Sequence, residues 1–249
     1  MFKVFKSSVL LSVSLFAGEI SVAVAANLSD VVDVLKTEFA KTHPTTKVNT
    51  ILGASGKFTT QIKSGAPFDL FMSADMKFPE TLYAEQFAVT KPVVYASGAL
   101  AMVSTKGLDL NKGILVLNDP KVEKIAIANP ATAPYGTASI EVFKKSQVFS
   151  TVEPKLVYGE SIGQALQFSL TAADVGFVNA SAFYSDKMKM YKEGKEWVKV
   201  DTTLYTPIEQ GIVLLKQAHN NDEAKDFYTF ILSASAKKIF KDYGYLVHE

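Results

Sequence analysis

Near its amino end the chain reads Glu19-Ile20-Ser21-Val22-Ala23-Val24-Ala25-Ala26-Asn27-Leu28-Ser29, an apolar run that ends in small and polar residues. The part up to Ala25 is typical of a buried β-strand. Ser29 and Asp30 are good helix-capping residues and come directly after it. Apolar residues at helical spacing follow: Val32, Leu35 and Phe39. The pattern predicts a strand that runs straight into the start of a helix.

The alternation of strand and helix continues downstream. Gly65 is expected to stop the second helix, and Pro79 to begin the third, at a position where its missing N–H has no cost. The predicted elements are strands at residues 47–52 and 68–73 and helices at residues 55–64 and from Pro79 onward. Such alternation indicates an α/β protein with a mainly parallel sheet.

A second unit of the same kind follows a crossover strand at residues 100–103. Its predicted elements are strands at 124–128, 156–158 and 174–178 and helices at 137–147 and 161–170. A returning strand at 211–216 and two helices within 221–243 complete the pattern. We therefore expect a discontinuous first lobe of residues 19–98 plus 208–249 and a second lobe of residues 99–207, joined by two strands. A ligand would bind between them, at the carboxyl ends of the strands.

The amino terminus has the features of an export signal. Lys3 and Lys6 precede an apolar run from Ser7 to Phe16, and Ala17-Gly18 supplies small residues for cleavage. The run is shorter than the roughly 20 residues that cross a bilayer. A buried first strand or helix is the alternative, but the residues from Glu19 to Ala26 make a better first strand. Residues 1–18 are therefore expected to be a signal peptide and the mature protein to be periplasmic.

Composition limits the partners. The 249 residues, 48% of them hydrophobic and 20% charged, suit two modest α/β lobes. Loss of Lys3 and Lys6 would lower the formal net charge of +1 by two, to −1. That balance gives no reason to expect nucleic acid or a membrane surface as partner. The chain has no cysteine, so it lacks the thiol of a lipoprotein anchor.

Residue patterns of catalysis are missing from the sequence. The three histidines, His43, His219 and His248, lie far apart, and without cysteine they do not predict a zinc site. No Gly-x-Ser-x-Gly elbow, phosphate loop or dinucleotide fingerprint occurs. Asp69 and Asp75 flank one predicted strand, where a carboxylate more often caps or braces a loop. The sequence therefore favours a binding protein over an enzyme.

Four junctions combine small or polar residues with the predicted start of a helix: Ala25 to Ser29, Gly53 to Gly56, Ala133 to Gly136 and Tyr158 to Gly163. Each would present unpaired backbone N–H groups and the positive end of a helix dipole. Ser55 stands where an N-cap is expected, and its hydroxyl could donate as well. Asn27 could donate through its amide, while Tyr135-Gly136 and Ile162-Gly163 offer main-chain N–H groups. Their convergence would make an anion site.

The cationic residues of the chain are all lysine: the sequence contains 26 of them and no arginine. A bidentate guanidinium clamp on a carboxylate or phosphate is therefore impossible. Lys57 could add charge to the site, although a solvated position on the second helix is as reasonable. An anion would be held mainly by N–H and O–H dipoles.

These segments resemble the periplasmic molybdate-binding proteins of ABC importers. The clearest similarity is Gln61-Ile62-Lys63-Ser64-Gly65-Ala66-Pro67-Phe68-Asp69-Leu70-Phe71-Met72-Ser73-Ala74-Asp75, close to that family's Q-I-x-x-G-A-P-x-D-[LV]-F-x-S-A-D segment. Further similar segments are Ile127 to Pro130 with Ala133 to Gly136, Ser161 to Leu166, Asp174 to Val178, and Phe227-Tyr228 with Ile239-Phe240 and Tyr243-Gly244. The similarity covers about residues 19 to 247.

The resemblance implies a type II periplasmic binding fold, two lobes with two connecting hinge strands, that closes on molybdate or tungstate. Carried over by position, the ligand contacts come from Asn27, Ser55, Tyr135 and Ile162, the last two through backbone N–H, with Ala26 as an additional contact. One subgroup has serine at the Asn27 position and a tyrosine contact at the position of Asn179. This chain resembles the subgroup with asparagine in the first loop, which leaves the role of Asn179 open.

The resemblance further implies a monomer that delivers its ligand to an ABC permease and needs no cofactor and no protein ligand to a metal. Two alternatives remain at the level of sequence. One is a receptor for sulfate or another tetrahedral oxyanion on the same scaffold, because ligand choice depends on a cavity size that sequence does not give. The other is a periplasmic hydrolase, for which the nucleophile with its base is missing. A further alternative is a purely structural interaction module, which would show no saturable binding of a small ligand.

Overall fold

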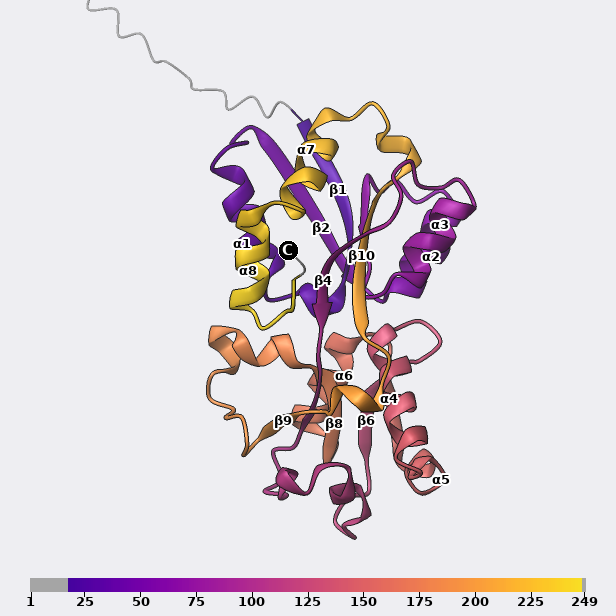
Figure 1. Cartoon of the computed structure of the whole chain (residues 1–249), viewed down its shortest axis with the longest axis vertical. Helices are drawn as coiled ribbons and strands as arrows, with labels where there is room; N and C mark the ends of the chain where they lie inside the picture. Colours follow the sequence, from indigo (N-terminus) through magenta and orange to yellow (C-terminus); the bar gives the residue numbers. More distant parts are fainter. Residues whose placement is uncertain (1–17, 248–249) are drawn as a thin grey trace, which may run out of the picture.

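The computed structural model describes residues 18–247, which form two lobes, each built on a five-stranded sheet (Figure 1). Nearly all of the predicted signal peptide, residues 1–17, lies outside the described residues. Within the described part no helix is both long enough and apolar enough to cross a membrane. The two-lobed α/β architecture with two connecting segments is the one that the sequence predicted.

The sheet of the first lobe has the strand order β2-β1-β3-β10-β4. Its strands are β1 (Gly18–Ala25), β2 (Thr46–Gly53), β3 (Leu70–Met72), β4 (Val93–Gly98) and β10 (Ile208–Leu214). β1 is parallel to both β2 and β3, and its register with β2 runs from Gly18 opposite Thr46 to Ala25 opposite Gly53. The two strands therefore end at the same edge of the sheet.

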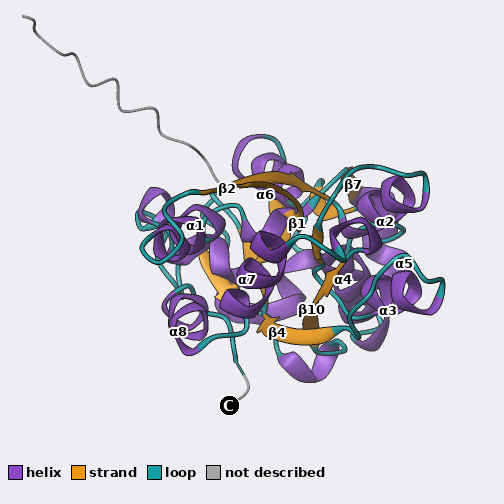
Figure 2. Ribbon diagram, turned by 90° about the horizontal axis from the view of Figure 1, so that it is seen from above, coloured by secondary structure: helices purple, strands orange, loops and turns teal. Residues whose placement is uncertain are grey.

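Helices cover both faces of this sheet. On one face lie α1 (Val32–Ala40), α7 (Asp222–Ile231) and α8 (Ala234–Asp242), and on the other α2 (Ser55–Lys63) and α3 (Lys77–Ala84) (Figure 2). Because side chains of a strand alternate between faces, Val22 and Val24 join the first cluster while Ala23 packs in the second. The near-continuous apolar run of β1 is thus the signature of a strand buried on both sides.

The sheet of the second lobe has the order β7-β6-β8-β5-β9. Its strands are β5 (Leu100–Val103), β6 (Ile125–Ala128), β7 (Leu156–Gly159), β8 (Val175–Asn179) and β9 (Trp197–Lys199). The helices of this lobe are α4 (Pro134–Lys145), α5 (Phe149–Val152) and α6 (Ile162–Thr171), with 3₁₀ segments at Leu110–Asn118, Glu153–Lys155, Ala180–Tyr184, Asp186–Met188 and Thr202–Leu204. The first lobe has 3₁₀ segments at Ala26–Leu28 and Lys216–Ala218. One continuous apolar core fills the lobe, with Phe143 packed edge-on against Phe177 at 4.8 Å.

Several local predictions were wrong. The sheets are mixed rather than mainly parallel, because β10 runs antiparallel to β3 and β4, and β5 antiparallel to β8 and β9. These antiparallel pairs involve the strands by which the chain leaves and re-enters the first lobe. The sequence did not predict β4 or the short β9. The returning strand β10 also begins three positions earlier than expected, at Ile208.

Two helix starts differ from the prediction. Ser29 and Asp30 do not cap α1: Ser29 ends the 3₁₀ turn over Ala26–Leu28, and the N-cap of α1 is Val31, without a side-chain hydrogen bond. Pro79 lies in the first turn of α3 but does not begin it, since the helix starts at Lys77. The missing N–H of Pro79 still has no cost there, because N–H groups of the first turn have no partner within the helix.

Asp69 ties three elements together at the far end of β3 from the cleft. Its carboxylate accepts from the N–H of Ser21 at 2.7 Å and from the amide of Asn221 at 3.4 Å, and its carbonyl accepts from the N–H of Leu215 at 2.8 Å. The sequence-based expectation that this aspartate braces a loop is confirmed.

Asp69→Ala should destabilise the fold, because the N–H of Ser21 loses its acceptor. We expect a loss of about 1–3 kcal/mol in the free energy of unfolding, measured by urea denaturation. Asp33→Ala is the matched control, since the Asp33 side chain is 80% exposed and, among the described residues, pairs only with Lys36. Equal stability of the two variants would contradict the bracing role.

Candidate functional site

All four junctions meet at one small cavity between the lobes. It is lined by Ala25, Ala26, Asn27, Gly53, Ala54, Ser55, Ala74, Ala133, Pro134, Tyr135 and Ile162. The space open to the centre of a water-sized sphere is about 10 Å³, on the scale of a single water molecule. None of the described residues that line it has a charged side chain. The cavity therefore offers dipoles rather than a counter-ion.

The first lobe contributes Asn27 and Ser55. Ser55 is the first residue of α2 and not its N-cap, which is Ala54. Its hydroxyl oxygen accepts from the N–H of Ala74 at 3.0 Å, and the residue is buried. Since this contact uses a lone pair, the hydroxyl hydrogen remains available to donate into the cavity.

The second lobe contributes the starts of α4 and α6. Pro134 occupies the first position of α4 and Tyr135 the second, while Ile162 is the first residue of α6 behind its N-cap Ser161. The N–H groups of Tyr135 and Ile162 therefore have no acceptor within their helices. With α2, three helices of nine to twelve residues present their positive ends to the cavity.

Asn27 and Asn179 use their amide hydrogens on the protein. The NH₂ group of Asn27 donates to Gln210 Oε1 at 2.9 Å and to the hydroxyl of Tyr245 at 3.1 Å. That of Asn179 donates to the carbonyl of Asn27 at 3.3 Å and to Ser181 Oγ at 2.8 Å. Asn179 thus fastens the end of β8 to the first loop and does not line the cavity.

Sequence reasoning missed a group of buried side chains that supports this loop. Tyr245 donates to the carbonyl of Asn27 at 2.8 Å and accepts from Ser181 at 2.9 Å. Tyr95 and Gln210 lie beside them, on β4 and β10. Burial raises the pKa of the Tyr95 and Tyr245 hydroxyls above the usual tyrosine value, so both stay neutral phenols. No local motif marks these residues; only their pairing in space reveals them.

Two further contacts join the lobes at the rim of the cavity. The N–H of Gly56, at the start of α2, donates to the carbonyl of Thr132 at 2.8 Å. Lys57 pairs with Glu160 across the cleft, and both side chains are partly exposed. Lys57 is therefore held at the outer rim and is not among the residues that line the cavity.

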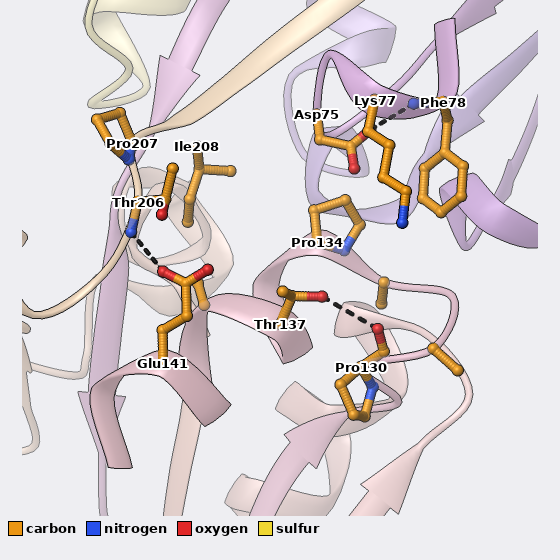
Figure 3. Close-up of a pocket in the computed structure, with 13 residues that line it drawn as sticks. Asp75, Lys77, Phe78, Pro130, Pro134, Thr137, Glu141, Thr206, Pro207 and Ile208 are labelled. Carbon is orange, nitrogen blue, oxygen red and sulfur yellow. Dashed lines mark hydrogen bonds between the residues drawn. The ribbon is translucent and has the colours of Figure 1, made fainter. Parts of the chain in front are cut away.

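A larger hollow of about 190 Å³ lies next to this cavity, between α3, α4 and the segment before β10 (Figure 3). Its wall is mostly apolar, and its polar groups are largely paired: Glu141 accepts from the N–H of Thr206 at 2.6 Å. Burial raises the pKa of the Asp75 carboxyl there, although hydrogen bonds from Phe78 N–H and Ser73 oppose the shift. Its carboxylates make it unsuited to an anion.

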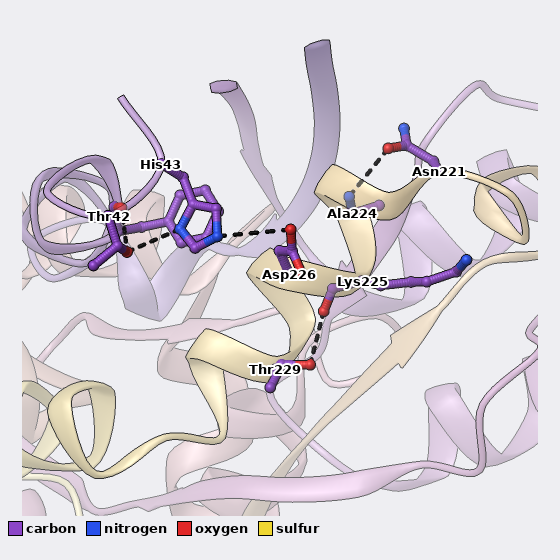
Figure 4. A network of polar contacts seen from close by, with 8 residues as sticks. Thr42, His43, Asn221, Ala224, Lys225, Asp226 and Thr229 are labelled. Carbon is purple, nitrogen blue, oxygen red and sulfur yellow. Dashed lines mark hydrogen bonds and ion pairs between the residues drawn. The ribbon is translucent and has the colours of Figure 1, made fainter. Parts of the chain in front are cut away.

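The described residues contain no cluster of three or more histidine, aspartate or glutamate side chains that could hold a metal ion. His43 instead stacks on Phe39, with ring centres 4.3 Å apart, and faces Asp226 at 3.6 Å (Figure 4). It connects α1 to α7 on the outside of the first lobe. In the described part of the chain the chemistry of the site is therefore that of neutral hydrogen-bond donors.

Two α/β lobes joined by two crossing segments, with helix starts of both lobes facing one small cavity, define a receptor that closes on a small ligand. A model of the family described as bacterial extracellular solute-binding protein matches residues 20–246, and the chain belongs to this family.

Individual relatives agree with this assignment. The molybdate-binding protein ModA of Rhodobacter capsulatus is 40% identical over 233 residues, which cover 92% of this chain and 89% of the relative. The protein of the same name from Azotobacter vinelandii is 37% identical over 238 residues, covering 95% and 93%. A solved structure of the Azotobacter vinelandii periplasmic molybdate-binding protein superposes with a TM-score of 0.85 at 31% identity, covering 92% of this chain and all of that one.

Gly56→Ala should hinder closure of the lobes. An added methyl group would lie 2.9 Å from the Thr132 Cα atom and 3.1 Å from its carbonyl oxygen, and backbone cannot move aside cheaply. We expect ligand affinity to fall about tenfold or more while thermal stability of the ligand-free protein is kept. Small-angle scattering with and without ligand would report the closure. Gly65→Ala does not serve as a control because of its positive φ, so Thr60→Ala on the same helix is used.

Proposed function

We propose that this chain is a periplasmic receptor that captures molybdate, and tungstate with it, between its lobes and delivers it to an ABC permease. The observation that carries the proposal is the meeting of four backbone junctions at one cavity without a charged wall. The names of the relatives at 37–40% identity agree with it. The protein transforms nothing in this role and needs no cofactor.

The donors have assigned roles in this proposal. Ser55 donates through its hydroxyl and its N–H, Tyr135 and Ile162 through their N–H groups, and Asn27 through its side-chain amide, with the backbone at Ala26 beside it. A dianion surrounded in this way exchanges its water shell for charge-assisted hydrogen bonds and helix dipoles. Molybdenum is bound only as the oxyanion, with no protein ligand to the metal. Asn179 acts by holding the first loop.

The size of the cavity and its donors also limit the class of ligand. Organic ligands occupy clefts of roughly 300–1,000 Å³, far beyond the space described here. Hydrogen phosphate would need an acceptor for its proton, and the nearest carboxylate in the loop, Glu160, is turned to Lys57. A fully deprotonated tetrahedral anion fits the donor set best. Sulfate shares that chemistry and is smaller, so cavity size must decide against it.

The proposal also covers export, oligomeric state and the movement of the lobes. Residues 1–18 direct export and are removed, leaving a monomer without a lipid anchor. Residues 19–98 plus 208–249 move as one lobe and residues 99–207 as the other, about the crossings near Ala99 and Ile208. The closed form, held by the Gly56–Thr132 and Lys57–Glu160 contacts, is the form that the permease recognises.

Calorimetric titration of the mature chain with molybdate, tungstate, sulfate and phosphate at neutral pH tests the proposed function. We expect one-to-one binding of molybdate and tungstate, with sulfate at least about a hundredfold weaker and phosphate silent. Equal or tighter binding of sulfate would assign the chain to the sulfate alternative. No heat and no thermal shift with any of the four anions would refute an oxyanion receptor.

Ser55→Ala isolates one donor. Removing a hydroxyl that is buried against the anion should weaken molybdate binding by about 1–3 kcal/mol. Thr60→Ala is the matched control, because Thr60 lies on the same helix and its hydroxyl donates only to the carbonyl of Gly56. Unchanged affinity in Ser55→Ala would remove this residue from the site.

A further inference from the structure

Gln210 is a fully buried polar side chain at the centre of the cluster behind the cavity. It lies on β10 at a register shift opposite Tyr95, where β4 carries one extra residue. The bulge turns Tyr95 toward it, and the hydroxyl of that residue is 2.9 Å from Gln210 Oε1. We call Asn27, Tyr95, Tyr135 and Gln210 the amide–tyrosine cluster.

The donors and acceptors of this cluster are not all satisfied. With both hydrogens of its NH₂ group given to Gln210 and Tyr245, Asn27 is left with Oδ1, which is buried and has no partner among the described residues. Tyr95 has one hydroxyl hydrogen but two acceptors in reach, Ser73 O at 3.0 Å and Gln210 Oε1 at 2.9 Å. Tyr95 therefore faces one acceptor more than it can serve, and Asn27 Oδ1 is left without a donor.

Rotating both amides by 180° resolves the mismatch without moving heavy-atom positions. The NH₂ group of Gln210 then donates to Asn27 Oδ1 and to the Tyr95 hydroxyl, and Tyr95 gives its single hydrogen to Ser73. Tyr135, 3.3 Å from the Gln210 amide, donates to Gln210 Oε1. Tyr245 still accepts from Ser181 but gives its one hydrogen to Asn27 Oδ1, 3.1 Å away, while the carbonyl of Asn27 keeps the hydrogen bond from Asn179. Asn27 NH₂ takes the place of the orphaned oxygen.

We propose, building on the proposed function, that Gln210 is a positioning residue which sets the Asn27 amide with its NH₂ group toward the anion. Asn27 lines the cavity, so the atom not engaged by the cluster is the one left for the ligand. An oxygen there repels an anion, whereas an NH₂ group makes a charge-assisted hydrogen bond. The arrangement that satisfies every hydrogen bond of the cluster is therefore also the one that presents a donor to the anion.

The cluster also joins the two lobes. Gln210 belongs to the strand on which the chain returns to the first lobe, and Tyr135 to α4 of the second. In the satisfied arrangement Tyr135 donates to Gln210 Oε1. A glutamate at this position could only accept when ionised, and would hold the Asn27 NH₂ group away from the anion.

The test compares Gln210→Met with Asn27→Ala and the double variant, by molybdate titration. Met keeps the length of the side chain and adds no charge. We expect each single variant to lose about ten- to a hundredfold in affinity, and the double variant to bind no more weakly than Asn27→Ala alone. Additive losses would overturn the proposal, because Gln210 would then act independently of Asn27. Gln217→Met on the surface is the matched control.

A spectroscopic readout separates positioning from mere packing and does not depend on a variant. In the ¹⁵N-labelled unaltered chain, saturating molybdate should shift the side-chain amide signals of both Asn27 and Gln210. A Gln210 signal that stays in place while Asn27 moves would show that the two amides are not coupled and would overturn the proposal. If the unaltered chain binds no oxyanion, the proposed function fails and this proposal with it. Binding by the unaltered chain without coupling refutes the proposal alone.

Discussion

The in-register parallel pairing of β1 with β2 is the constraint on which the site depends. Because Ala25 lies opposite Gly53, both strands end at one level, and the chain must turn into helical structure at one edge of the sheet. The same holds in the second lobe, where Ala128 lies opposite Gly159. Helix starts need acceptors for their first N–H groups. The two edges face each other across the cleft, so an anion bound there can accept from the helix N–H groups of both lobes.

Much of the fold and of the cavity lining could be predicted from the sequence, because both depend on short-range residue patterns. Strand–helix junctions leave a local signature of small and polar residues, so Asn27, Ser55, Tyr135 and Ile162 could be named, and all four line the one cavity. β4 was missed because it carries a bulge and ends in the small residues Ala96-Ser97-Gly98, which interrupt the apolar alternation. Gln210, Ser181 and Tyr245 could not be found, since their roles come from partners that are distant in sequence.

Charge is kept at the rim. The chain has only lysine as a permanent cation, and Lys57, the one beside the second junction, is paired with Glu160 outside the cavity. A buried lysine would need compensation in the ligand-free protein, whereas backbone dipoles carry no net charge and are fixed by the fold. The polar groups behind the cavity are neutral as well, because burial keeps Tyr95, Tyr135 and Tyr245 protonated.

The contact of Tyr245 with the carbonyl of Asn27 joins residues 218 positions apart. On a ribosome, the first loop emerges long before the residue that supports it. A nascent or truncated chain can form β1 and its neighbours and still lack the hydroxyl that fixes Asn27. Completion of the binding site is thereby tied to completion of the polypeptide, so a prematurely ended product would have a misformed first loop and would compete poorly for scarce ligand.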